Sequence, residues 1–200
     1  MNRIRYRVPL VNQRTSPVCW LACAIMLFQR NGLRTISPTE IDYINGDPRL
    51  ASMDNIPGGN AAMYTYLRNW GFRVRRIRQV HVQLRTYNPP GRNPVEPQSM
   101  VWHSTDRQVE ETIIHATLLN FGPFILFHRC GMFSYGPNRT TPTTGSHAVV
   151  ITGVDLDRKV CYFNNPWGDV NVPTTLRSIV GAIRDWESRG GSPSMAYLVG

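Results

Sequence analysis

The order of apolar and polar positions divides the chain into a part rich in helix signals and a part rich in strand signals. Residues 19–30 are apolar on nearly every side and are followed by Asn31-Gly32, so they predict a buried helix with a glycine stop. Helical spacing and capping signals predict further helices at residues 37–40, 60–70, 106–120 and 174–187. The helix at residues 19–30 should therefore lie in the centre of the molecule.

Strand signals fill most of the second part. Residues 72–84 alternate apolar and basic side chains, as a half-exposed strand or hairpin does, and shorter apolar runs predict strands at residues 123–129, 147–154, 159–164 and 195–199. Proline-rich and glycine-rich stretches at residues 86–98 and 131–145 predict loops. Helices first and strands last indicate an α+β fold, with a helical half of about residues 1–121 beside an antiparallel sheet half of about residues 122–200. We expect the functional site in a cleft between the halves.

Length and composition fit a single domain over residues 1–200. The chain has 200 residues, of which 42% are hydrophobic, enough for one substantial core. The longest apolar run, residues 18–28, is too short to span a membrane. Residues 1–7 are charged but lack the apolar run and small-residue cleavage site of a secretory signal. We therefore expect synthesis in the cytoplasm and, if the protein is exported, another route.

The positive charge is concentrated in arginine. The net charge is +9, and Lys159 is the only lysine. Residues 68–92 contain seven arginines and no acidic residue, a pattern that can contact nucleic acid or an acidic protein. The ordinary interpretation of such a run is a solvated strand face, and we prefer it.

Cysteine spacing argues against a structural metal or a disulfide framework. The four cysteines, Cys19, Cys23, Cys130 and Cys161, form neither a C-x-x-C pair nor a short cluster with histidine. Cys19 and Cys23 lie one helical turn apart and cannot bridge comfortably. We expect four free thiols, no metal and no cofactor.

Cys19 is the candidate nucleophile. It lies at the start of the most buried predicted helix, where unpaired backbone N–H groups and the helix dipole favour a thiolate. The same N–H groups can stabilise the oxyanion formed when a carbonyl is attacked. A buried cysteine is more often a small core residue, and we give that role to Cys23, Cys130 and Cys161.

Three polar residues elsewhere in the sequence are suited to assist Cys19. Gln13, six residues upstream, can reach the attacked carbonyl, and His147 begins an apolar strand after a loop. Asn165 follows the next strand, so adjacent antiparallel strands would bring its side-chain carbonyl beside the imidazole, where an indole from Trp167 can shield the hydrogen bond. Asn164 competes for the role of Asn165. Two carboxylates, Asp155 and Asp169, are weaker alternatives for orienting His147, and His81, His103, His115 and His128 are expected to be structural or at the surface.

Four stretches together resemble the papain-like (clan CA) cysteine peptidases. They are the run from Gln13 to Trp20, Gly122-Pro123 before a strand, the run from Ser146 to Gly153, and Asn165-Pro166-Trp167-Gly168. Asn-Pro in place of the Asn-Ser of papain is closer to compact bacterial members, the AvrRpt-like effector peptidases and the double-glycine leader peptidases. The resemblance implies a papain-like fold with Cys19 as nucleophile, His147 as base, Asn165 as orienting residue and Gln13 in the oxyanion hole. Trp20 and Trp167 are candidate substrate-binding residues.

The implied reaction is cleavage of a target protein through a thioester acyl-enzyme. The nucleophile lies within the first twenty residues, so we expect no propeptide; the compact relatives instead imply a bacterial effector or toxin. Such an enzyme would be delivered by a secretion system into a target cell and held in check by a cognate immunity protein, and it would cut at small residues such as Gly-Gly. The alternatives are a peptidoglycan amidase or endopeptidase toxin, and a non-catalytic binding module that uses the arginine-rich residues 68–92.

Overall fold

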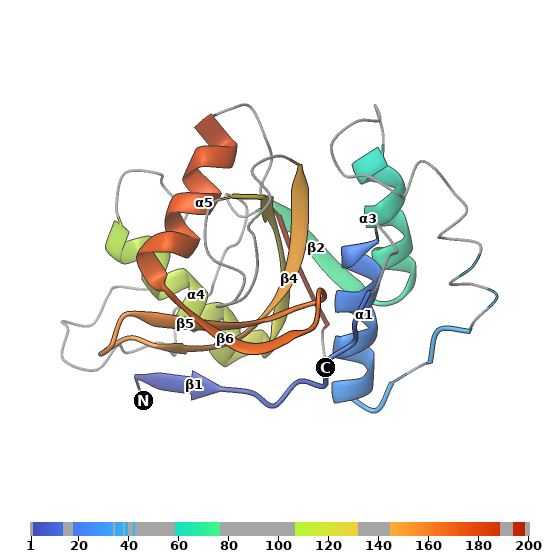
Figure 1. Ribbon diagram of the computed structural model, residues 1–200, viewed down its shortest axis with the longest axis horizontal. Helices are drawn as coiled ribbons and strands as arrows, with labels where there is room; N and C mark the ends of the chain where they lie inside the picture. The colour runs from blue at the N-terminus through green and yellow to red at the C-terminus, as the bar shows by residue number, and fades with distance from the viewer. Residues whose placement is uncertain are drawn as a thin grey trace.

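A seven-stranded antiparallel sheet forms the centre of the described part of the molecule (Figure 1). The computed structural model describes residues 2–13, 18–33, 35–37, 39, 42, 59–76, 107–131, 145–188 and 194–198. The strands are β1 (Arg3–Arg5), β2 (Phe72–Arg76), β3 (Phe124–Arg129), β4 (Ser146–Asp155), β5 (Val160–Asn165), β6 (Asp169–Thr175) and β7 (Ser194–Leu198). Their order is β2-β7-β3-β4-β5-β6, and β1 pairs with the last residues of β4.

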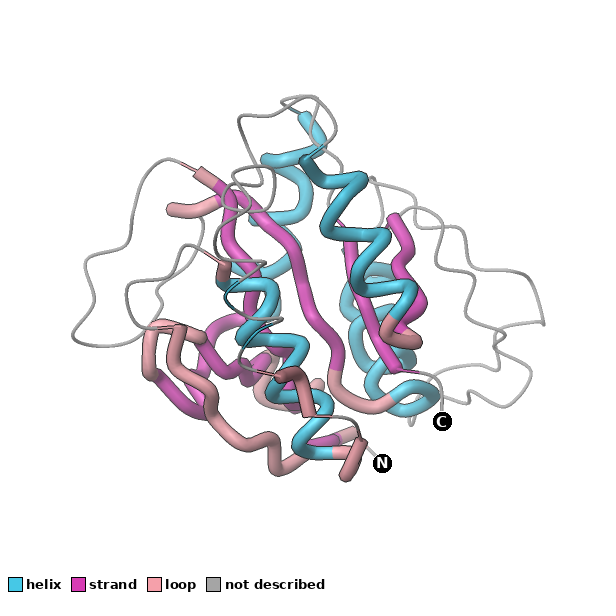
Figure 2. The backbone as a smooth tube through the Cα atoms, turned by 90° about the vertical axis from the view of Figure 1, so that its right-hand side faces the viewer, coloured by secondary structure: helices cyan, strands magenta, loops and turns pink. Residues whose placement is uncertain are grey.

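Two layers of helices cover the sheet, one on each face (Figures 1 and 2). The helices are α1 (Cys19–Arg30), α3 (Gly59–Asn69), α4 (Arg107–Phe121) and α5 (Leu176–Ser188). Alternation along β3 shows the division: Ile125 and Phe127 pack in one core with α1 and α3, whereas Phe124 and Leu126 pack in the other with α4 and α5. Because both faces of β4 are covered, nine of its ten residues are buried.

The apolar surface of α1 explains its central position. Nine of its twelve residues are buried, and its first aromatic residue, Trp20, stacks on Trp70 with ring centroids 5.9 Å apart. The helix ends where Asn31 donates from Nδ2 to the carbonyl of Leu27 and Gly32 adopts a φ of 61°. This is the glycine stop predicted from the sequence.

The predicted α+β arrangement is confirmed, but the two halves interleave more than the sequence indicated. β1 and β2 lie within residues 1–121 and nevertheless belong to the sheet, and α4 from the same segment covers the opposite face from α1. β6 was not predicted, because its sequence is polar and contains Pro173; it is tolerated as the edge strand that ends the sheet. Half of the short helix expected at residues 37–40, all of the loop expected at 86–98 and all but the first and last residues of the loop expected at 131–145 lie outside the described residues. None of the helices in the described ranges is long and apolar enough to cross a membrane.

Gly153 allows β1 to approach β4 closely. A Cβ at this position would lie 2.6 Å from the carbonyl oxygen of Ile4 and 3.1 Å from the Cα of Arg5. We therefore expect Gly153→Ala to lower the free energy of unfolding by about 1–3 kcal/mol, as overpacking does, in urea denaturation. Gly181 in α5 is the matched control, since nothing lies within 4 Å of its Cβ position, and Gly181→Ala should be neutral or stabilising. Equal midpoints for the two variants would contradict this view of the β1–β4 contact.

Candidate active site

Cys19 is the first residue of α1 and lies over the beginning of β4. The residue is only 4% exposed, and its thiol interacts with the backbone of Ala148, the residue that follows His147. One helical turn later, the Cys23 thiol donates to the Ala148 carbonyl at 3.4 Å. The first turns of α1 are thus anchored to the end of β4 at which His147 is found.

His147 is oriented by Asn165 on the neighbouring strand. The Nε2 of His147 lies 3.0 Å from Oδ1 of Asn165. The amide orientation of Asn165 is fixed independently, because its Oδ1 also accepts from the Trp167 backbone N–H at 3.2 Å and its Nδ2 donates to Asp169 at 2.9 Å. An amide oxygen only accepts, so Nε2 of His147 carries the proton. The lone pair of the neutral ring is therefore on Nδ1, and this nitrogen can accept a proton.

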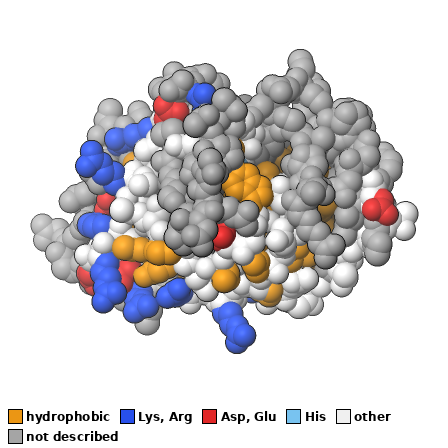
Figure 3. Space-filling model, in the orientation of Figure 1, with side chains coloured by type: hydrophobic (Ala, Val, Ile, Leu, Met, Phe, Trp, Pro, Cys, Tyr) orange, Lys and Arg blue, Asp and Glu red, His pale blue; other side chains and the backbone are white. Residues whose placement is uncertain are grey.

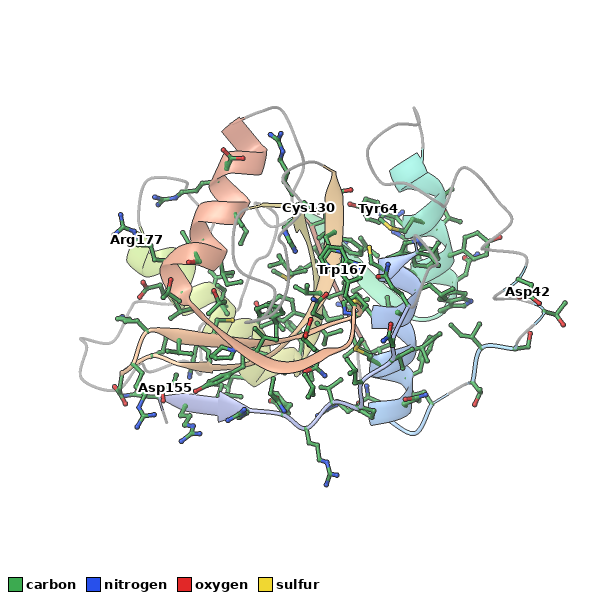
Figure 4. The ribbon with its side chains drawn as sticks, in the orientation of Figure 1. Asp42, Tyr64, Cys130, Asp155, Trp167 and Arg177 are labelled. Atoms are coloured by element: carbon green, nitrogen blue, oxygen red, sulfur yellow. The ribbon has the colours of Figure 1, made fainter. Side chains whose placement is uncertain are left out.

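Trp167 covers the imidazole. The two rings are stacked with centroids 4.1 Å apart and planes at 24°. Figure 4 shows Trp167 near the middle of the molecule. An indole stacked on the ring can shield the hydrogen bond between His147 and Asn165 from water.

Gln13 is held against the turn that carries Asn165 and Trp167. Its backbone N–H donates to the carbonyl of Pro166 at 2.8 Å, which ties the N-terminal segment to this end of the sheet. Trp20, the other residue expected to bind substrate, is placed differently. It is 1% exposed and lies in an aromatic cluster with Tyr66 and Trp70, so in this structure it is a core residue.

The structure distinguishes Asn165 from its competitor. Asn164 points to the other face of β5, where it donates to the carbonyl of Val8 at 3.0 Å and accepts from the Asn171 N–H at 2.9 Å. Asp155 is at the far end of β4, as Figure 4 shows, and its carboxylate accepts from the N–H of Arg158. Both are structural residues of turns and strand connections.

Asp169 has a role that sequence reasoning missed. It was considered as a direct partner of His147, but it instead binds the amide of Asn165 from the paired position on β6. The signal available in the sequence was the four-residue spacing across a Pro-Trp-Gly turn, which brings residues 165 and 169 face to face. Asp169 thus holds the amide of Asn165, which in turn binds His147.

Burial keeps both Cys19 and His147 neutral at rest. Desolvation raises the pKa of Cys19 to about 12, although a backbone hydrogen bond from Ala148 opposes the shift. Desolvation also lowers the pKa of His147 to about 4, against the opposing effect of the hydrogen bond to Asn165. The position at the helix terminus predicts a lowered pKa of the thiol, but the cost of burying its charge is larger.

These shifts predict a loss of stability in acid. The pKa of His147 is about 4 in the folded state against 6.5 for an ordinary histidine, so between these pH values the unfolded chain binds a proton that the folded chain does not. Stability therefore falls as the pH is lowered through this window. The pKa of His128, lowered to about 3 by burial, has the same sign. We expect the urea midpoint of the wild-type protein to drop between pH 7 and pH 4.5, and we expect a smaller drop in His147→Gln. A wild-type midpoint that is the same at both pH values would contradict this link between the buried histidines and stability.

The fold is that of a papain-like cysteine peptidase. Residues 5–193 match the sequence model of the Peptidase_C39 like family, and the chain belongs to that family. The match spans every element of the described structure from the end of β1 to α5. No curated protein matches the chain significantly. The family supports hydrolysis by a cysteine peptidase.

Proposed function

We propose that the protein is a cysteine endopeptidase in which Cys19 is the nucleophile, His147 the base, Asn165 the residue that orients the base and Gln13 a donor to the oxyanion. The observation that carries the proposal is the hydrogen bond from Nε2 of His147 to Asn165, 3.0 Å long and covered by Trp167, at the end of β4 over which α1 begins. This geometry leaves Nδ1 of the imidazole as the proton acceptor.

The reaction proceeds by acyl transfer. As the sulfur of Cys19 attacks a peptide carbonyl, its proton passes to Nδ1 of His147, and the carbonyl oxygen becomes an oxyanion bound by the Cys19 backbone N–H and the Gln13 amide. The C–N bond then breaks and the leaving amine takes the proton from His147, which yields a thioester. Water, deprotonated by the same imidazole, hydrolyses the thioester and restores the thiol.

The Cys19 thiol and the His147 imidazole become charged only during the reaction. Thiol and imidazole are both uncharged near neutral pH, so the ion pair has to form when the substrate is bound. In a buried site the two opposite charges stabilise each other more strongly than they would in water.

Burial of the nucleophile supports a preference for small residues at the scissile bond. With 4% of Cys19 exposed, a bulky side chain next to the attacked carbonyl would have to displace packed residues. We propose cleavage after small residues such as Gly-Gly, which agrees with the resemblance to the double-glycine leader peptidases. The test compares peptides that differ only in having Gly-Gly or Phe-Leu before the cleaved bond; equal kcat/KM values would refute this specificity.

We further propose that the enzyme is an effector of bacterial competition restrained by an immunity protein. The resemblance to compact effector peptidases supports this setting. The test is co-expression of the Cys19→Ala protein with its neighbouring gene products, followed by affinity purification. Capture of one small protein that also blocks the wild-type enzyme would support the proposal, whereas growth of the wild-type producer without any such protein would oppose it.

The experiment for the peptidase itself is incubation with an unfolded protein substrate and identification of new N-termini by mass spectrometry. Cleavage that disappears after alkylation of Cys19 supports the proposal. Digestion of purified peptidoglycan without protein cleavage would favour a cell-wall enzyme instead. Salt-sensitive DNA binding that survives Cys19→Ala would favour an arginine-rich binding module.

The described arginines fit a solvated face better than a nucleic-acid site. Arg73 and Arg75 are exposed on β2 and alternate with the buried Phe72 and Val74, as on any half-covered edge strand. On the face shown in Figure 3, Lys and Arg side chains gather mainly on the side of β1 and the β4–β5 turn, where Arg3, Arg5, Arg158 and Lys159 are exposed. Positive charge is thus spread over separate surfaces.

A further inference from the structure

A second buried imidazole lies beside the proposed base. His128 on β3 is the direct antiparallel partner of His147 on β4. Their rings meet edge to face, with centroids 5.9 Å apart and planes at 87°. His128 is fully buried, with 0% exposure, and no step of the proposed reaction uses it.

The hydrogen bonding of His128 defines a single tautomer. Its Nδ1 lies 2.7 Å from the carbonyl oxygen of Arg129, and because a carbonyl only accepts, Nδ1 carries the proton. Burial lowers the pKa of His128 to about 3, so the ring is neutral at neutral pH. The two adjacent histidines therefore have opposite tautomers, with the proton on Nδ1 in His128 and on Nε2 in His147.

The ring of His147 thus has three contacts that restrict its rotation. Asn165 binds Nε2 at its edge, Trp167 stacks on its face, and His128 meets it at a right angle. A fixed imidazole is what general-base catalysis needs, because a shift of about 1 Å in a reacting group can cost a hundredfold in rate.

We propose that His128 is a positioning residue that, together with Trp167, holds the His147 ring so that Nδ1 faces the Cys19 thiol. This inference rests on the proposed function of Cys19 and His147. His128 suits the role because it remains uncharged while His147 gains a proton in the reaction. A cation at the same place would repel the imidazolium, and a small side chain would leave the ring free to turn.

The test uses three substitutions measured for the alkylation rate of Cys19, for kcat and KM on a peptide substrate, and for melting temperature. His128→Ala removes the ring, and His128→Phe keeps an aromatic ring but no titratable nitrogen. His115→Ala is the matched control, since His115 is an equally buried imidazole, 2% exposed, on α4. Activity is measured well below each melting temperature, so that only folded protein is compared.

We expect His128→Ala to lower kcat and the alkylation rate by about ten- to a hundredfold, with KM changed by less than about twofold. His128→Phe should recover most of the loss, and His115→Ala should alter the melting temperature alone. Imidazole ¹⁵N spectra of the wild-type protein should show a proton on Nε2 of His147 and on Nδ1 of His128. Loss of the single His147 tautomer in His128→Ala would support the role even if no substrate is found.

Wild-type alkylation and kcat in folded His128→Ala would overturn the inference and leave the proposed function standing. A wild-type Cys19 that reacts no faster than the other thiols would instead overturn the proposed function. If His128→Ala does not fold, His128→Phe and the spectra of the wild-type protein provide the test. Positioning by the ring is refuted if folded His128→Phe loses as much activity as His147→Ala. It is also refuted if His147 of the wild-type protein is a mixture of tautomers.

Discussion

Replacement of Cys19 by alanine is expected to reduce peptide hydrolysis by at least about a thousandfold, because removal of a nucleophile eliminates the covalent route. The protein should fold as before, since alanine is smaller than cysteine and α1 keeps its other buried residues. The measurement is kcat/KM on a cleavable peptide, with circular dichroism to confirm the fold.

Cys161→Ala is the control for the loss of a buried thiol. Cys161 is 0% exposed and lies on β5 in the core shared with α4 and α5, on the other side of the sheet from α1. This variant should be somewhat less stable and fully active per folded molecule. Equal activity of Cys19→Ala and Cys161→Ala would show that Cys19 is not the nucleophile.

Replacement of His147 by alanine should have the second largest effect, a loss in kcat of about a thousandfold or more. Without the imidazole, the proposed acceptor of the Cys19 proton is lost, and burial of the thiol keeps its pKa near 12. Raising the pH should therefore restore part of the reactivity of Cys19 in His147→Ala only in strongly alkaline solution. A variant that retains more than about a tenth of wild-type kcat would show that another group is the base.

Local patterns predicted most elements of this fold. The buried helix from Cys19 to Arg30, its stop at Gly32 and the strands on either side of the Asp155–Arg158 turn follow from apolar runs and turn residues that act over a few positions. β6 escaped prediction because an edge strand has one open side and needs no continuous apolar pattern. The assignment of α4 to the opposite face from α1 depends on contacts between distant segments, which sequence periodicity does not contain.

The same distinction between local and long-range contacts applies to the site. The placement of Asn165 beside His147 could be predicted, because consecutive antiparallel strands bring their facing ends together. The contributions of Asp169 and His128 could not, since each depends on the register of a further strand. The neutral state of Cys19 was also hidden, because the cost of burying a charge depends on packing around the whole first turn of α1.

The most direct test of the central claim is competition among the four thiols for iodoacetamide in the folded protein at pH 7.5, read out by peptide mapping. All four cysteines are buried and none is in a disulfide, so exposure alone would make them react at similar slow rates. The account predicts that Cys19 is alkylated at least about tenfold faster than Cys23, Cys130 and Cys161, and that His147→Ala abolishes the difference. Alkylation of Cys19 no faster than that of the other three, in the wild-type protein with its structure intact, would contradict the assignment of nucleophile and base.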